Sequence, residues 1–103
     1  MLKFFYVLDP PENQEKPPVQ ISFAVSKRNF KLAVKRNLLK RRLREAYRLN
    51  SFPLKQHLTD NERRLWVIVI YQSREAIPYQ KVERLMKKGL SQLRKKAGFR
   101  LPD

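Results

Sequence analysis

One stretch of the chain constrains the fold most. Residues 31–48 (KLAVKRNLLKRRLREAYR) contain neither Gly nor Pro, and eight of these residues are Lys or Arg. Apolar side chains recur there at the helical period of about 100° per residue and form one stripe. The stripe consists of Leu32, Leu39, Leu43, Ala46 and Tyr47, with Leu38 and Leu49 widening it on one side. The pattern predicts a helix from about residue 31 to about residue 49.

The opposite face of this predicted helix carries charge of almost one sign. It is made of Asn37, Lys40, Arg41, Arg44 and Arg48, with Arg36 at its edge. A helix face built for solubility mixes both signs and gains i,i+4 ion pairs. The only acid of the stretch is Glu45, for which we expect pairing with Arg41 or Arg42. We interpret the basic face as a surface that binds a polyanion.

The composition of the whole chain supports this interpretation. The 103 residues, enough for a single domain, include 24 basic and 9 acidic ones, which gives a net charge of +15. Such a field favours nucleic acid or an anionic membrane surface. A membrane-lying helix would need an apolar face free to enter lipid, whereas here the stripe is needed for the core. No Cys is present, which excludes a disulfide framework and a thiolate nucleophile and fits a cytosolic protein.

Three apolar stretches predict strands. Residues 2–8 (LKFFYVL) and 19–25 (VQISFAV) flank a Pro-rich loop at 10–18, and the simplest arrangement is an antiparallel hairpin. Residues 65–71 (LWVIVIY) predict an interior strand buried on both faces, or nearly so. Residues 54–58 suggest a short turn, and Pro78 suits the first turn of a second helix. That order predicts a two-layer α/β sandwich with helices on one face of a small sheet.

Several residues outside the basic helix are candidate contacts. Lys27 and Arg28 precede the helix, where Ser26 or Asn29 would cap it and a phosphate would meet free N–H groups. Alternation places Phe4 and Tyr6 on one face of the first strand and Phe5 on the other. Each is more typical of a core residue, but Tyr6 is the best candidate for stacking on an unpaired base.

The sequence shows no catalytic constellation. His57 is the only His and falls in a predicted loop, and the nine acids lie mostly in predicted loops and ends. Neither a nucleophile–base pair nor the convergent carboxylates of a two-metal site can be assembled from them. From the residues alone we predict an RNA-binding domain with no catalytic or metal-binding residues.

Residues 33–48 also resemble the signature helix of the bacterial ribonuclease P protein subunit. The positions that match its pattern are Ala33, Val34, Arg36, Asn37, Leu39, Lys40, Arg41, Leu43, Arg44, Glu45, Ala46 and Tyr47. The preceding residues 23–27 (FAVSK) resemble that family's strand ending in Val-Ser-Lys. Leu38 departs from the pattern, because the family usually has a second Arg there, and Lys31-Leu32 replace a frequent Gly-Asn. The family's N-terminal helix has no counterpart before Met1, so we expect residues 1–103 to be one RNA-binding domain without that helix.

The resemblance implies a ribosomal-protein-S5-domain-2-like fold with a left-handed βαβ crossover. It implies a cytoplasmic subunit that joins a catalytic RNA to remove the 5′ leader of precursor transfer RNA, while the RNA and its Mg²⁺ perform the hydrolysis. Arg36, Asn37, Arg41 and Arg44 would face the catalytic RNA. The other RNA-binding candidates are Lys27, Arg28, Lys40 and Arg48, and Tyr6 with Lys27 would line the leader-binding cleft. Neither a membrane nor a stable protein partner is expected, and the alternative is a ribosomal-type structural RNA-binding protein with no role in cleavage.

Overall fold

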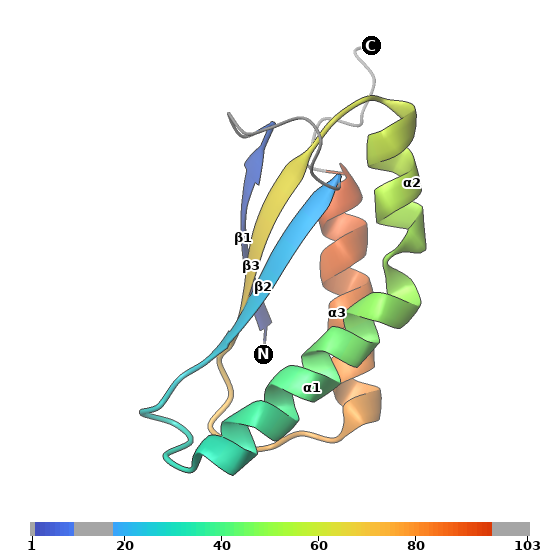
Figure 1. Ribbon diagram of the computed structural model, residues 1–103. Helices are drawn as coiled ribbons and strands as arrows, with labels where there is room; N and C mark the ends of the chain where they lie inside the picture. Colours follow the sequence, from blue (N-terminus) through green and yellow to red (C-terminus); the bar gives the residue numbers. More distant parts are fainter. Residues whose placement is uncertain (1, 10–17, 96–103) are drawn as a thin grey trace.

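The described part of the chain forms three strands and three helices in an α/β arrangement. The computed structural model describes residues 2–9 and 18–95. In chain order the elements are β1 (Leu2–Leu8), β2 (Val19–Val25), α1 (Ala33–Asn50), α2 (Phe52–Asp60), β3 (Leu65–Tyr71) and α3 (Tyr79–Arg94). The three strands form one sheet and all three helices lie on the same side of it (Figure 1). The predicted two-layer sandwich is confirmed; residues 10–17 of the predicted Pro-rich loop lie outside the described part.

The most apolar strand occupies the centre of the sheet. The strand order is β1-β3-β2, with β1 antiparallel to β3 and β2 parallel to it. The predicted hairpin between β1 and β2 is therefore wrong. An apolar strand is poorly suited to an exposed edge, so β3 pairs on both sides while the two more polar strands take the edges.

The parallel strands β2 and β3 are joined by a crossover through α1 and α2. In Figure 1 the chain descends β2, rises through α1 and α2 on the right, and then descends β3 behind β2. This path is left-handed, which is the rare hand for such a connection. General sequence rules predict the right-handed form, so the handedness confirms the expectation drawn from the family resemblance.

The core lies between the sheet and the helices. Leu39, Leu43 and Ala46 of α1 are completely buried, and the alternating residues of β3 that face them are at most 2% exposed. Ile68, on the other face of β3, is 47% exposed. The prediction that β3 is buried on both faces is therefore wrong, because the helices cover only one side of the sheet.

The start of α1 differs from the prediction. The helix begins at Ala33, and Leu32 occupies the N-cap position with extended backbone and no side-chain cap. Capping by Ser26 or Asn29 is therefore wrong. Because Leu32 precedes the first helical turn, its side chain does not join the apolar stripe and is 70% exposed. The other predicted stripe residues from Leu39 to Tyr47 are buried.

A short second helix replaces the turn predicted at residues 54–58. α2 follows α1 directly, with Pro53 in its first turn, where a missing N–H costs nothing. Leu54 and Leu58 are buried by it. His57 consequently lies on this helix, partly buried, and not in an exposed loop as predicted.

α3 lies against the edge strand β1 at its one glycine. A Cβ added at Gly89 would come within 2.2 Å of the Phe4 ring, so the helix and the aromatic ring occupy adjoining space. Pro78 is the N-cap of α3, one position before the predicted place in the first turn. The apolar side of α3 is buried: Val82, Met86, Gly89, Leu90 and Leu93 are covered, and Leu85 packs against the core.

Candidate nucleic-acid interface

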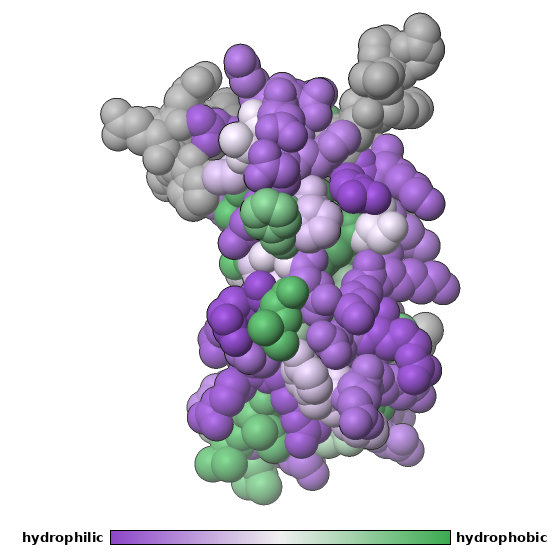
Figure 2. Space-filling model, turned by 90° about the vertical axis from the view of Figure 1, so that its right-hand side faces the viewer, coloured by the Kyte–Doolittle hydropathy of each residue, from purple (hydrophilic) through white to green (hydrophobic). Residues whose placement is uncertain are grey.

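The basic side of α1 faces away from the sheet. Asn37, Arg41 and Arg44 are exposed and Lys40 is partly buried. Among the described residues, none of these four side chains has a hydrogen-bond or ion-pair partner. Viewed from the helix side, the molecular surface is dominated by hydrophilic side chains (Figure 2). The structure therefore brings together four of the predicted contacts as an uncompensated surface, which we call the α1 basic face (Asn37, Lys40, Arg41 and Arg44).

Packing on the opposite side fixes how α1 presents this face. Leu39 and Leu43 are completely buried, so rotation of the helix about its axis would expose core residues. The Arg42 guanidinium donates a 2.8 Å hydrogen bond to the carbonyl oxygen of Ile77, which ties α1 to the segment before α3. Arg42 thus serves the fold, while its neighbours Arg41 and Arg44 face solvent.

Arg36 has a structural role that the sequence did not reveal. Its guanidinium donates to the carbonyl oxygens of Phe30 at 2.7 Å and Lys31 at 2.9 Å. Phe30 is buried beside Tyr71, with 5.8 Å between the ring centroids. Arg36 therefore closes the β2–α1 loop (residues 26–32) onto the helix. It does so from the edge of the α1 basic face, where it is partly buried.

The β2–α1 loop carries Lys27 and Arg28 as exposed side chains. The Ser26 hydroxyl accepts a 3.0 Å hydrogen bond from the Arg28 amide, and the Phe30 amide donates to the Ser26 carbonyl. Ser26 therefore organises the turn and does not cap the helix. The loop adds two cations beside the start of α1, as predicted for that junction.

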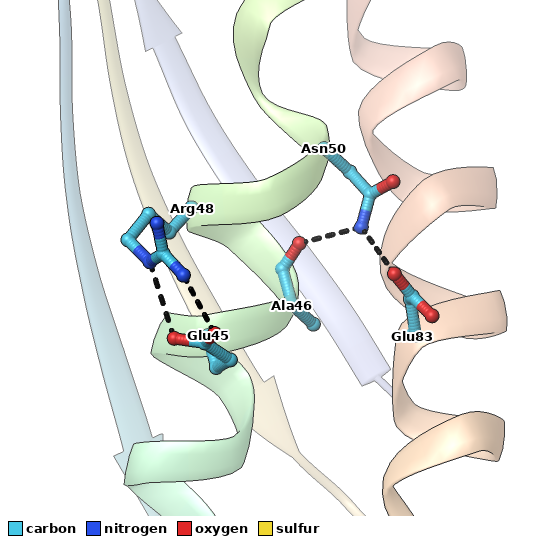
Figure 3. Close-up of polar contacts among 5 residues, drawn as sticks. All are labelled: Glu45, Ala46, Arg48, Asn50 and Glu83. Atoms are coloured by element: carbon cyan, nitrogen blue, oxygen red, sulfur yellow. Dashed lines mark hydrogen bonds and ion pairs between the residues drawn. The ribbon is translucent and has the colours of Figure 1, made fainter.

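Arg48 is compensated by an acid on its own helix. Its guanidinium donates twice to the Glu45 carboxylate, at 3.2 and 2.7 Å (Figure 3). The hydrogen bond from Arg48 lowers the pKa of Glu45, and the same contact raises the pKa of Arg48. The predicted pairing of Glu45 with Arg41 or Arg42 is wrong. Because its charge is already paired, Arg48 is a weaker candidate for polyanion binding than Arg41 or Arg44.

A second acid marks the border between α1 and α3. The Asn50 side-chain amide donates to the carbonyl oxygen of Ala46 at 2.8 Å and to the Glu83 carboxylate at 3.0 Å (Figure 3). Burial and the nearby Glu83 and Glu45 carboxylates raise the pKa of Tyr79. Asn50, Tyr79 and Glu83 therefore form a strip of low net charge where α1 and α3 meet.

The sheet face opposite the helices is open and apolar. Strand register aligns Phe5 with Ile68 and Ser22, and Val7 with Trp66 and Gln20. These residues line a hollow of about 610 Å³, in which Phe5 is 47% exposed. Phe5 is the aromatic residue of β1 on this face. Tyr6, the predicted stacking residue, also borders this hollow.

Tyr6 lies on the helix side of the same strand. It pairs in register with Val67 and borders a smaller hollow of about 220 Å³ that also involves Gly89 and Gln92 of α3. Lys27 follows the end of β2, whereas Tyr6 lies near the middle of β1, and β3 separates the two strands. The structure does not bring Tyr6 and Lys27 together as the two walls of one cleft.

The described residues offer no place for a metal ion. No group of three or more His, Asp or Glu side chains in residues 2–9 and 18–95 is arranged to hold one. Asp9 pairs with Arg63 at 2.7 Å. Over the same residues, no helix is long and apolar enough to cross a membrane.

One protein-family model matches most of this chain. The family model named Ribonuclease P matches residues 3–94, which includes every described strand and helix except the first residue of β1. This chain belongs to the ribonuclease P protein family. The α1 basic face lies within residues 33–48, the stretch whose sequence resembles that family most closely.

Two curated relatives carry the name Ribonuclease P protein component. The protein of Porphyromonas gingivalis is 40% identical over 67 residues, which are 65% of this chain and 49% of the relative. That of Chlorobium phaeobacteroides is 52% identical over 48 residues, or 46% of this chain and 33% of the relative. The matched part thus spans half or less of each relative's length. No solved structure matches the chain significantly.

Proposed function

We propose that this chain is the protein subunit of ribonuclease P. It docks on a catalytic RNA through the α1 basic face and assists the removal of the 5′ leader from precursor transfer RNA in the cytoplasm. The observation that carries the proposal is the uncompensated cationic face of α1, held rigidly by a buried stripe, in a chain of this family. Lys and Arg at such a face displace condensed counterions from the RNA backbone, which supplies binding free energy.

The division of labour follows from the chemistry that the chain offers. Mg²⁺, held by the RNA, would supply the activated water and the charge stabilisation for hydrolysis. The protein side chains would bind and orient RNA: Arg41 and Arg44 contact phosphates, and the Asn37 amide donates to phosphate or 2′-hydroxyl oxygens. Lys27 and Arg28 extend the same positive surface along the loop that Arg36 closes.

The open sheet face is the surface we propose for the single-stranded leader. Phe5 and Trp66 line its hollow, and base–aromatic stacking is worth about 1–3 kcal/mol per base. Tyr6 borders the same hollow but also the smaller hollow towards α3, so it is shared between the two sides of the sheet edge. Phe5→Ala is expected to weaken leader-dependent affinity more than Tyr6→Ala does. If Phe5→Ala and Tyr6→Ala bind a precursor with a leader equally well, and likewise a precursor without one, the leader does not bind this face.

Cleavage by a ribonuclease P RNA tests the proposed function against the ribosomal alternative. Precursor cleavage is measured over a Mg²⁺ series with and without the protein. A subunit of the enzyme lowers the Mg²⁺ requirement or raises the affinity for the precursor. A structural RNA-binding protein with no role in cleavage changes neither, and that result would overturn the proposal in favour of the alternative.

A further inference from the structure

The outer side of α3 carries a second cationic surface, separate from the α1 basic face. Within α3, basic residues outnumber acids five to one, and the single acid is Glu83. Lys81, Arg84, Lys87, Lys88 and Arg94 are all exposed, as is Lys95 directly after the helix. None of these six side chains has a partner among the described residues. A solvated helix face built for solubility would mix the two signs.

A groove gives this second surface a shape. Asn50, Pro53 and Leu54, at the junction of α1 and α2, face α3 across a hollow of about 210 Å³. The α3 side of the hollow is formed by Lys87, Leu90, Ser91 and Arg94. Lys87 and Arg94 are seven residues apart on one helix side, about 10 Å along the axis. The Ser91 hydroxyl lies between them as a further hydrogen-bond donor.

The strip of low net charge separates this groove from the α1 basic face. Glu83 of α3 accepts a hydrogen bond from Asn50 where α1 and α3 meet (Figure 3). The Glu83 carboxylate would repel a phosphate placed between the two helices. One polyanion strand lying evenly over both helices is therefore disfavoured, and two separate contacts are favoured.

From this arrangement we propose that the α3 groove binds the phosphodiester backbone of a second segment of structured RNA. Two cations on either side of a hydroxyl donor, in a narrow groove with apolar walls, match the charge of successive phosphates and carry no base-reading geometry. With the α1 basic face on one segment and α3 on another, the protein would hold two RNA segments at a fixed separation. This inference rests on the proposed function, since it assumes that the partner is RNA.

The test compares the affinity for a ribonuclease P RNA among three doubly substituted proteins that lose equal charge. The α3 variant is Lys87→Gln/Arg94→Gln, and the α1 variant is Arg41→Gln/Arg44→Gln. The matched control, Lys55→Gln/Arg74→Gln, removes two exposed cations elsewhere. We expect the α3 variant to bind about tenfold more weakly than the control, as for two exposed ionic contacts. The slope of log affinity against log salt should fall by about 0.7–0.9 per lost contact.

The outcomes separate the two proposals. If the α3 variant binds like the control while the α1 variant is weakened, the α3 groove carries no RNA and this inference is overturned. If the α1 variant also binds like the control, the proposed function itself fails. If the wild-type α3 surface instead retains an acidic peptide that RNA does not displace, the partner is a protein and the inference is again wrong.

A second pair of substitutions separates the groove from the rest of the α3 surface. Lys88→Gln/Lys95→Gln removes two cations that point outward from α3 and do not line the groove. Thermal unfolding followed by circular dichroism shows whether each variant folds like the wild type. The Lys88/Lys95 variant should bind like the control, because its cations lie outside the groove. Should the groove variant unfold, the single variants Lys87→Gln and Arg94→Gln replace it: unchanged affinity and salt slope in both would overturn the inference, and a reduced slope would support it.

Discussion

Arg36 shows how one residue can serve the fold from within a binding surface. Its guanidinium bonds to two loop carbonyls, so its hydrogen-bonding capacity is partly used by the protein. A family resemblance assigns the residue to RNA, and the structure adds a second role as the closure of the β2–α1 loop. Lys27 and Arg28 depend on that closure for their position beside α1.

Replacement of Arg36 should loosen the loop. In Arg36→Lys the charge remains, but the shorter side chain does not carry a donor to the position of Nη1, which donates both bonds, each worth about 0.5–1.5 kcal/mol net. Hydrogen exchange in residues 26–32 is expected to accelerate while the amides of α1 stay protected. Arg41→Lys, which makes no such bonds, is the control and should leave the loop unchanged. Equal exchange in both variants would show that the two bonds do not hold the loop.

Because the phenol of Tyr47 is buried, we expect the protein to lose stability at alkaline pH. Burial raises the pKa of Tyr47 to about 12, with the Ser51 side chain acting in the opposite direction. Since the unfolded chain ionises this group near its ordinary pKa of about 10, stability from the neutral phenol is present below pH 10 and is lost towards pH 12. Tyr47→Phe should show a smaller decline in the free energy of unfolding over that interval. An identical decline in the wild type and in Tyr47→Phe would mean that other groups cause the loss of stability.

At the scale of elements, α1 depends on its buried stripe. Leu43 is completely buried, so Leu43→Ala should lower the free energy of unfolding by about 2–5 kcal/mol. Leu32, on the same segment but 70% exposed, supplies the matched control, and Leu32→Ala should change it by less than about 0.5 kcal/mol. Denaturant titration of both variants measures the difference. Comparable losses of unfolding free energy in the two variants would mean that Leu43 is not part of the buried stripe.

The contact between α3 and β1 depends on the absence of a side chain at Gly89. In Gly89→Ala the added methyl group would meet ring carbons of Phe4 at 2.2 Å, an overpacking that typically costs about 1–3 kcal/mol. The gain in helix propensity, about 1 kcal/mol, offsets part of this cost. Net destabilisation is expected, and Phe4→Leu in the same protein should relieve it. A stabilised Gly89→Ala protein would show that the Phe4 ring moves freely aside.

Over the whole molecule, local patterns predicted the elements but not their spatial order. The period of residues 33–50 and the apolar run of β3 identified both elements, because burial on one side imposes a repeat on the sequence. Pairing of β3 with both other strands is a long-range choice that no local repeat records. The handedness of the crossover came from the family resemblance, since the general rule points the other way.

The candidate site was predictable to a similar extent. Charge periodicity identified Arg41 and Arg44 because exposed positions follow directly from the core stripe. The pairing of Arg48 with Glu45 and the use of Arg36 inside the loop depend on rotamers, which a helical wheel does not contain. The exposure of Phe5 on the open face depends on which side of the sheet the helices cover, which the alternation of β1 does not contain.

The central claim is that the α1 basic face docks on a catalytic RNA. Its most direct test is the salt dependence of affinity for a ribonuclease P RNA, measured for the wild type and for the Arg41→Gln/Arg44→Gln protein. The slope of log affinity against log salt is predicted to fall by about 0.7–0.9 for each arginine that contacts a phosphate, without a change in thermal stability. An unchanged slope in a folded variant would contradict the account and would mean that both arginines are merely solvated.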